Sequence, residues 1–91
     1  MNDYLLKRAE AALKFCYESR KHVEAMQRDL ARLSMDVEPL TARLAMEPLI
    51  PVTAKMASDE IREQSWALRC ELAAILAEER TWREIYEMTR P

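Results

Sequence analysis

The sequence predicts an all-α protein built as an antiparallel hairpin of two long helices. Three observations predict this fold. The 91 residues include no glycine and only four prolines, three of which lie between residues 39 and 51. Without glycine, the chain has no low-cost residue for the positive φ angles that many turns in β-sheet proteins require. On both sides of the proline-rich stretch, small and apolar residues recur at alternating spacings of four and three, which is typical of helices that pack along one face.

The first helix is expected over residues 3–37. Asn2 or Asp3 can cap its start, because their side-chain oxygens accept hydrogen bonds from free backbone N–H groups. The alternating spacing continues for about five heptads, which is a strong signal for coiled-coil packing. The predicted seam of this helix, with its continuation past residue 37, consists of Leu5, Ala9, Ala12, Cys16, Ser19, Val23, Met26, Leu30, Leu33, Val37, Leu40 and Leu44.

The prolines predict a kink and a turn over residues 38–52. The seam spacing continues past Pro39, so the first helix either bends there or ends near Asp36. Both alternatives follow from proline, which lacks an N–H group and disfavours helix at the residue before it.

The reversal of the chain is expected at Pro48 and Pro51. The tip of this turn is apolar, at Leu49 and Ile50. We interpret it mainly as a turn, with a proline-rich ligand motif as the alternative.

The second helix is expected over residues 53–89. Ser58 can cap its start, with Asp59 and Glu60 in the first turn, where acids interact favourably with the helix dipole. A start at Pro51 is the alternative, because proline suits the first helical turn. The predicted seam of this helix consists of Ile61, Ser65, Leu68, Leu72, Ile75, Glu79, Trp82, Tyr86 and Thr89.

A reversal near residue 49 would pair seam residues whose numbers sum to 98. Small residues of the first helix then face bulky residues of the second, as interdigitated packing requires. One layer, Ser19 with Glu79, is polar, and such layers often fix the register of a coiled coil. The other pairs are Ala12 with Tyr86, Cys16 with Trp82, Val23 with Ile75, Met26 with Leu72, Leu30 with Leu68 and Val37 with Ile61.

The same pairing separates the two cysteines. Cys70 is level with residue 28 and therefore roughly 18 Å from Cys16 along the helix axis. A disulfide needs Cα atoms within about 7 Å. We expect two reduced thiols, with Cys16 in the seam and Cys70 on the outer face.

The helices carry more apolar surface than one seam can cover. Leu13, Phe15, Leu76 and Ile85 flank the seam, and a face this wide is typical of a helix bundle. We therefore expect a four-helix bundle, completed by a second copy or by a different protein.

Two basic columns repeat every seven residues. Lys7, Lys14, Lys21 and Arg28 face directly away from the seam, where solvated lysines are ordinary. Glu10 is expected to support Lys14, and Glu24 to support Arg28, from one helical turn earlier. The other column flanks the seam of the second helix and includes arginines beside aromatic residues, a common composition of protein interfaces. It consists of Arg62, Arg69, Leu76, Arg83 and Arg90. Asp59, Glu79 and Glu87 can pair locally with Arg62, Arg83 and Arg90, but Arg69 has no obvious partner. The predicted interface residues are Leu13, Phe15, Arg69, Leu76, Trp82, Arg83, Ile85 and Tyr86, with Leu49 and Ile50 at the turn tip.

The sequence contains no recognisable catalytic or cofactor-binding motif. The single histidine, His22, shares a helix face with Glu18 and collects no further metal ligands. A phosphate-binding loop needs glycine. The net charge of −2 and pI of about 5.5 argue against nucleic acid, and no apolar run reaches the roughly 18–20 residues of a membrane span.

We therefore expect one domain of residues 1–91, without cofactor, metal or small-molecule substrate, in the cytoplasm. The predicted function is non-enzymatic protein–protein interaction, as a small adaptor, chaperone or inhibitor that binds another protein, itself, or both. A structural homo-oligomeric subunit is the alternative, and a dimeric all-α enzyme with a site between hairpins is a remote one.

Overall fold

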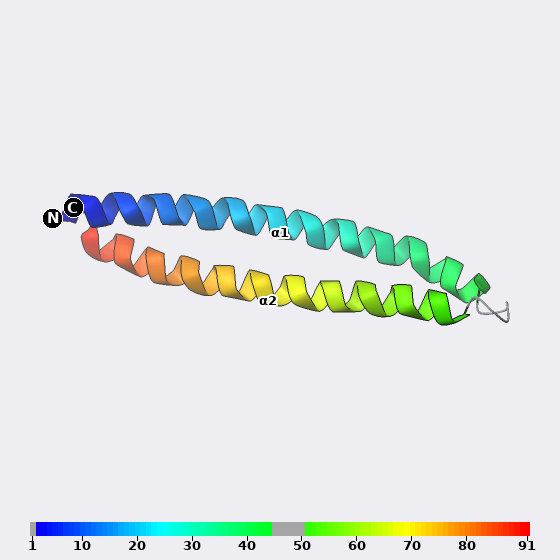
Figure 1. Cartoon of the computed structure of the whole chain (residues 1–91). Coiled ribbons are helices and arrows are strands. Elements are labelled where there is room, and N and C mark those ends of the chain that lie inside the picture. Colours follow the sequence, from blue (N-terminus) through cyan, green and yellow to red (C-terminus); the bar gives the residue numbers. More distant parts are fainter. Residues whose placement is uncertain (1, 45–50) are drawn as a thin grey trace. The chain divides into compact units, whose positions relative to one another are not determined.

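The computed structural model confirms the all-α prediction. Two helices make up the structure, α1 over Asn2–Leu44 and α2 over Pro51–Thr89. They pack antiparallel as a hairpin (Figure 1). The structure describes residues 2–44 and 51–91, and for residues 2, 38, 40–44, 51–55 and 57 it describes the backbone alone. The predicted turn tip at Leu49 and Ile50 lies outside the described residues.

Both helices are longer at the turn than the sequence pattern predicts. α1 continues through Pro39 to Leu44, so of the two alternatives at this proline the end near Asp36 is wrong. α2 begins at Pro51, the alternative start, and Ser58 is therefore an interior residue and not a cap. Proline at the first position of a helix costs no hydrogen bond, because the first N–H groups have no partner within the helix.

The chain divides into two compact units, to which both helices contribute. Unit 1 comprises Met1–Glu24 and Cys70–Pro91, and unit 2 comprises Ala25–Arg69. In each unit a segment of α1 packs against a segment of α2 (Figure 1). The prediction of a single domain stays a prediction.

The core of unit 1 is formed by small residues of α1. Ala9, Cys16 and Val23 are buried, at 0%, 2% and 2% exposure. They recur every seven residues, as the predicted seam requires, and their small side chains allow the two helix backbones to approach each other. The α2 seam residues of this unit are all half-buried, which confirms the predicted α2 face; they are Leu72, Ile75, Glu79, Trp82, Tyr86 and Thr89.

The buried face of α1 is rotated relative to the prediction. Leu5 was expected in the seam, but it is 41% exposed. Its neighbour Leu6, which was not placed in the seam, is half-buried, as is Leu13. In unit 2, Met26 and Leu33 of the predicted seam are 43% and 47% exposed. α1 thus packs through the column that begins at Ala9, with half-buried residues on both sides of it, namely Ala12 and Ser19 of the predicted seam and Leu6 and Leu13 of the adjacent column.

The core of unit 2 lies around Leu68, which is 8% exposed, and the half-buried Leu30. Hollows open on either side of them. One has a volume of about 290 Å³ and is lined by Gln27, Leu30, Ala31, Ser34, Ser65 and Arg69. The other, of about 250 Å³, is lined by Met26, Asp29, Leu30, Leu33, Gln64 and Leu68. Leu30 and Leu68 line one hollow together, which agrees with their predicted pairing.

Two contacts between the helices of unit 1 report on the register. Arg20 Nη1 lies 3.4 Å from Glu79 Oε2, one position from the predicted layer of Ser19 and Glu79. The guanidinium of Arg8 lies over the Trp82 ring, 5.7 Å from its centroid. The sequence pairing placed Trp82 opposite Cys16, two helical turns further along α1. The first contact agrees with the predicted register, whereas the second shows that Trp82 extends toward the start of α1.

Candidate protein interface

The predicted interface residues fall into an exposed group and a half-buried group. Phe15 and Leu76 are 68% and 42% exposed, and the Arg83 side chain is 63% exposed. All three lie in unit 1. Arg69 is exposed as well but is the last residue of unit 2. The structure therefore does not bring all the predicted residues together in one described surface.

The half-buried group belongs to the packing between the helices of unit 1. It consists of Leu13, Trp82, Ile85 and Tyr86. The guanidinium of Arg8 lies over the Trp82 ring, 5.7 Å from its centroid. A cation over an indole face stabilises by about 0.5–1 kcal/mol at exposed sites. Because these residues are half-buried, only part of each side chain is accessible to a binding protein.

Glu79 is the centre of an ion-pair chain across unit 1. Its side chain is 13% exposed, and its Oε1 accepts a hydrogen bond of 2.9 Å from Arg83 Nη2. Its Oε2 is buried, 3.4 Å from Arg20 Nη1, without a hydrogen bond of good geometry. Arg20 Nε lies 3.8 Å from Glu24 Oε1. The chain of charges therefore runs from Glu24 on α1 to Arg83 on α2.

Two cations also lie beside the ring of Tyr17, which is 50% exposed. Arg20 lies 5.6 Å and Lys21 lies 5.4 Å from the centroid of the ring. An aromatic ring beside arginine is a frequent composition of interface hot spots.

The arginine column that flanks the α2 seam is only partly neutralised. Arg83 pairs with Glu79, and Arg90 Nε lies 3.1 Å from Glu87 Oε2. Both local pairs confirm the sequence prediction. Within the described part of the chain, Arg62 and Arg69 form no ion pair, so the expected help of Asp59 to Arg62 is absent.

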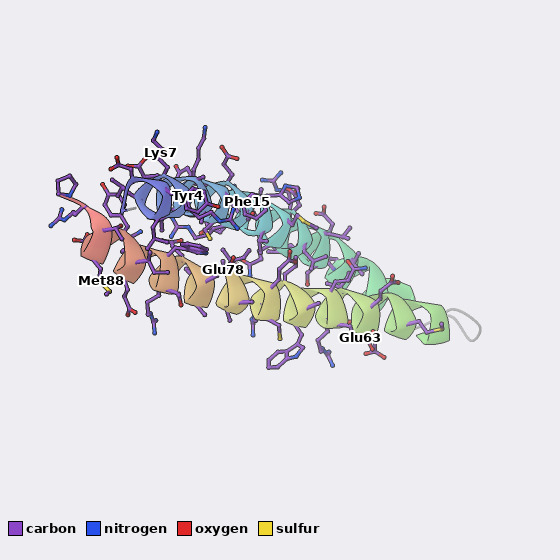
Figure 2. The ribbon with its side chains drawn as sticks, turned by 60° about the vertical axis from the view of Figure 1, so that its left-hand side comes forward. Tyr4, Lys7, Phe15, Glu63, Glu78 and Met88 are labelled. Carbon is purple, nitrogen blue, oxygen red and sulfur yellow. The ribbon has the colours of Figure 1, made fainter. Side chains whose placement is uncertain are left out.

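The outward-facing basic column is solvated, as predicted. Lys7, Lys14, Lys21 and Arg28 are exposed, and Lys7 points away from α2 (Figure 2). Glu24 was expected to support Arg28, but it lies beside Arg20 instead.

The two cysteines are free thiols in different surroundings. Cys70 is exposed, as expected. Cys16 is buried, and burial raises the pKa of its thiol above the ordinary 9.0, with further contributions from the negative charges of Glu78 and Glu79. A neutral thiol is a weak nucleophile, so Cys16 serves packing.

Further apolar side chains project from the helices outside the predicted set. Tyr4 on α1 is 76% exposed and Met88 on α2 is 84% exposed, and Met88 points away from α1 (Figure 2). In unit 2, Met35, Met56 and Trp66 are each at least 65% exposed.

The described part of the chain comprises the ranges 2–44 and 51–91. They hold no group of three or more His, Cys, Asp or Glu residues placed to bind a metal ion. Neither helix, as far as it is described, has a segment apolar and long enough to traverse a lipid bilayer.

The chain was compared with models of protein families, with curated proteins and with solved structures, and it matches none of them.

Sequence reasoning missed Arg8, Arg20 and Tyr17 as parts of this surface. The sequence places a glutamate, Glu79, in the α2 seam, and a carboxylate at such a position requires a cation beside it. Ser19 was taken as its counterpart, although Arg20 is adjacent and its longer side chain reaches across.

Proposed function

We propose that this protein is a helical-hairpin interaction module, which binds protein through the faces of its helices. One observation supports the proposal above all others. Among the described residues only four hydrophobic side chains are buried, whereas eleven large ones are more than 40% exposed. Exposed apolar surface on this scale marks an interaction site in a soluble protein.

The surface has the composition that binding energy requires. Removing apolar area from water contributes roughly 25 cal/mol per Å², and Phe15, Leu76 and Tyr17 present such area in unit 1. Arg83 and Arg69 add cations that bind carboxylates with defined geometry. Because the surface is carried on helices, little backbone ordering opposes binding.

Affinity capture from the native host, followed by mass spectrometry, tests the proposal. The wild-type chain is compared with Phe15→Glu, which places a charge on the exposed apolar face, and with Lys14→Glu, a matched change on the solvated column. We expect a protein that the wild type and Lys14→Glu retain and Phe15→Glu loses. A chain that stays monomeric and retains no protein in any of the three forms would contradict the proposal.

Completion of a four-helix bundle is the architecture that we propose for the bound state. A second hairpin laid on the first covers the columns beside the seam, and twofold dimers are the commonest oligomers. A structural homo-oligomeric subunit is the second candidate function, and the charge pattern described next favours it.

A further inference from the structure

Two columns of exposed residues flank the ion-pair chain of unit 1, one on each helix. Each repeats every seven residues and so follows one side of its helix. The acidic column on α1 consists of Asp3, Glu10, Tyr17 and Glu24, and the part of the arginine column that lies in unit 1 consists of Leu76, Arg83 and Arg90. The first three members of the acidic column are exposed and Glu24 is half-buried, and all members of the arginine column are exposed.

Both columns lie on the same side of unit 1. The ion-pair chain establishes this, because it begins at Glu24 in the acidic column and ends at Arg83 in the arginine column. Arg20 and Glu79 lie between them.

Within one chain the two columns do not pair with each other. Arg83 and Arg90 form ion pairs with carboxylates of their own helix, Glu79 and Glu87. Glu24 forms an ion pair with Arg20, which is also on its own helix.

The remaining charged members of the columns have no ion pair. In the described ranges, Asp3 and Glu10 are each without one. The acidic column therefore presents charge that a binding partner can neutralise.

In antiparallel order the two columns are complementary at three successive positions of unit 1. Asp3 matches Arg90, Glu10 matches Arg83, and Tyr17 matches Leu76. Acid meets arginine twice, and the aromatic residue meets leucine at the one apolar step in each column. A shift of one heptad would place Tyr17 against an arginine and Leu76 against an acid, so the pattern specifies one alignment.

We infer that the occupant of this face is a second copy of the chain. The inference rests on the proposed function and names its partner. A twofold axis parallel to the helices lays the acidic column of each copy on the arginine column of the other, so the contact forms twice. Such an axis keeps each residue at its own height, and the matched residue numbers sum to 93, between the sums of 99 for Arg20 with Glu79 and 90 for Arg8 with Trp82 inside the hairpin. Such an interface is self-complementary, as a twofold dimer requires. Arginine carries five N–H donors, so Arg83 and Arg90 can keep their local carboxylates while they bind those of the second copy.

The dimer is held by charge at its edges and by apolar contact at the Tyr17–Leu76 step. Leu76 and Tyr17 are 42% and 50% exposed in the single chain, and the second copy covers both. Opposed charges favour the correct register and disfavour slipped ones. The dimer is therefore expected to weaken as salt is added, since exposed charge pairs are screened.

Sedimentation equilibrium of charge-reversal variants tests the inference. Glu10→Arg and Arg83→Glu each place like charges together twice in the dimer, and we expect each to raise the dimer dissociation constant by about tenfold or more. The variant that carries both changes restores opposite charges across the interface and is expected to return toward the wild-type constant. An equimolar mixture of the two single variants is expected to form a mixed dimer for the same reason.

Two further variants act as matched controls. Lys14→Glu and Glu84→Arg change charge by the same amount in unit 1 but outside both columns, so we expect neither to alter the dissociation constant. Circular dichroism checks that all variants keep their helix content. Because Arg83→Glu also breaks the bond to the half-buried Glu79, the pair Asp3→Arg and Arg90→Glu repeats the test with an arginine whose partner in its own chain, Glu87, is exposed.

The outcomes separate this inference from the proposed function. A chain that is monomeric at all concentrations, or a dimer that ignores both pairs of reversals, overturns the inference. If such a chain still retains a different protein through Phe15, the proposed function stands without it. A dimer that single reversals weaken and combined reversals restore supports both.

Discussion

Arg20 Nη1 lies 3.4 Å from Glu79 Oε2, and this contact joins the two helices of unit 1. The glutamate occupies a position of the α2 seam that a packed core would give to an apolar residue. Arg83 binds its other oxygen at 2.9 Å. A carboxylate that is only 13% exposed must keep its cations, because an unpaired charge at such a position loses most of its hydration.

Glu79→Gln is expected to destabilise the protein by about 1–2 kcal/mol, because the neutral amide leaves Arg20 and Arg83 without their shared carboxylate. Urea denaturation, followed by far-UV circular dichroism at one protein concentration, measures the change in the free energy of unfolding. Glu84→Gln, an exposed position in the same unit, serves as the control and is expected to change it by less than about 0.5 kcal/mol. An equal loss in both variants would show that the ion-pair chain contributes nothing specific.

Replacing the pair by apolar residues gives a second test of the same contact. The double variant Arg20→Met and Glu79→Leu removes the two charges together and leaves neither unpaired. Buried ion pairs often give way to apolar residues at no cost or with a gain in stability. The double variant is therefore expected to be more stable than Glu79→Gln, and a lower stability would contradict this account.

The two cysteines are expected to differ in reactivity and in their effect on alkaline stability. A thiol reagent at neutral pH should modify the exposed Cys70 rapidly and the buried Cys16 only as the protein opens. Because the pKa of the Cys16 thiol is raised above 9.0 in the folded chain, the folded state keeps a proton that the unfolded state has lost. The stability from this group is complete below the ordinary pKa and is lost as pH rises from there toward the folded pKa.

Urea denaturation at a series of pH values checks the alkaline effect. Cys16→Ala is expected to lower stability at neutral pH through lost packing but to show a smaller decline above pH 9 than the wild type. Cys70→Ala should retain the wild-type decline. A decline of equal size in all three proteins would assign it to other groups.

Pro39→Ala is expected to stabilise the protein by about 1–3 kcal/mol. Proline in a helix interior removes the N–H group that would bond to the carbonyl four residues earlier, here that of Met35. α1 nevertheless continues through Pro39 to Leu44, so the helix bears this cost. Pro91→Ala, beyond the end of α2, is the control without an expected effect. If Pro39→Ala has no effect on stability either, the helix is not held across this position in solution.

The course of α1 at Pro39 shows how far the sequence could predict the fold. The alternating spacing indicated both helices and the residues of the α2 seam, all of which are buried or half-buried. It could not decide whether α1 ends at Pro39, because local propensity disfavours helix there while the seam spacing favours it. α1 continues as a helix through Pro39. α2 likewise continues through Ser58, although serine is a good capping residue.

The candidate interface was predictable in its types of residue and less so in its geometry. The arginine column was visible as a heptad repeat. The acidic column was not predicted as part of the interface. Lysines lie between its members along the sequence, and such mixed charge is ordinary on an exposed helix surface. Which α1 column packs against α2 also escaped prediction, because Leu5 and Leu6 are both leucine and either rotation gives an apolar face. That choice depends on side chains of α2, which no local pattern of α1 contains.

Leu5 and Leu6 therefore allow a direct test of the rotation of α1. Leu6→Ala is expected to cost about 1–2 kcal/mol, because Leu6 is half-buried and each buried methylene contributes roughly 0.8 kcal/mol. Leu5→Ala, at a position 41% exposed, is expected to cost less than half as much. The substitution is the same at neighbouring positions of one helical turn, so the effects of helix propensity and of fraying at the helix end cancel. Urea denaturation of the two variants side by side measures the difference. A larger loss for Leu5→Ala would restore the seam that the sequence spacing alone predicts, with α1 turned toward α2 by the column of Leu5, Met26 and Leu33.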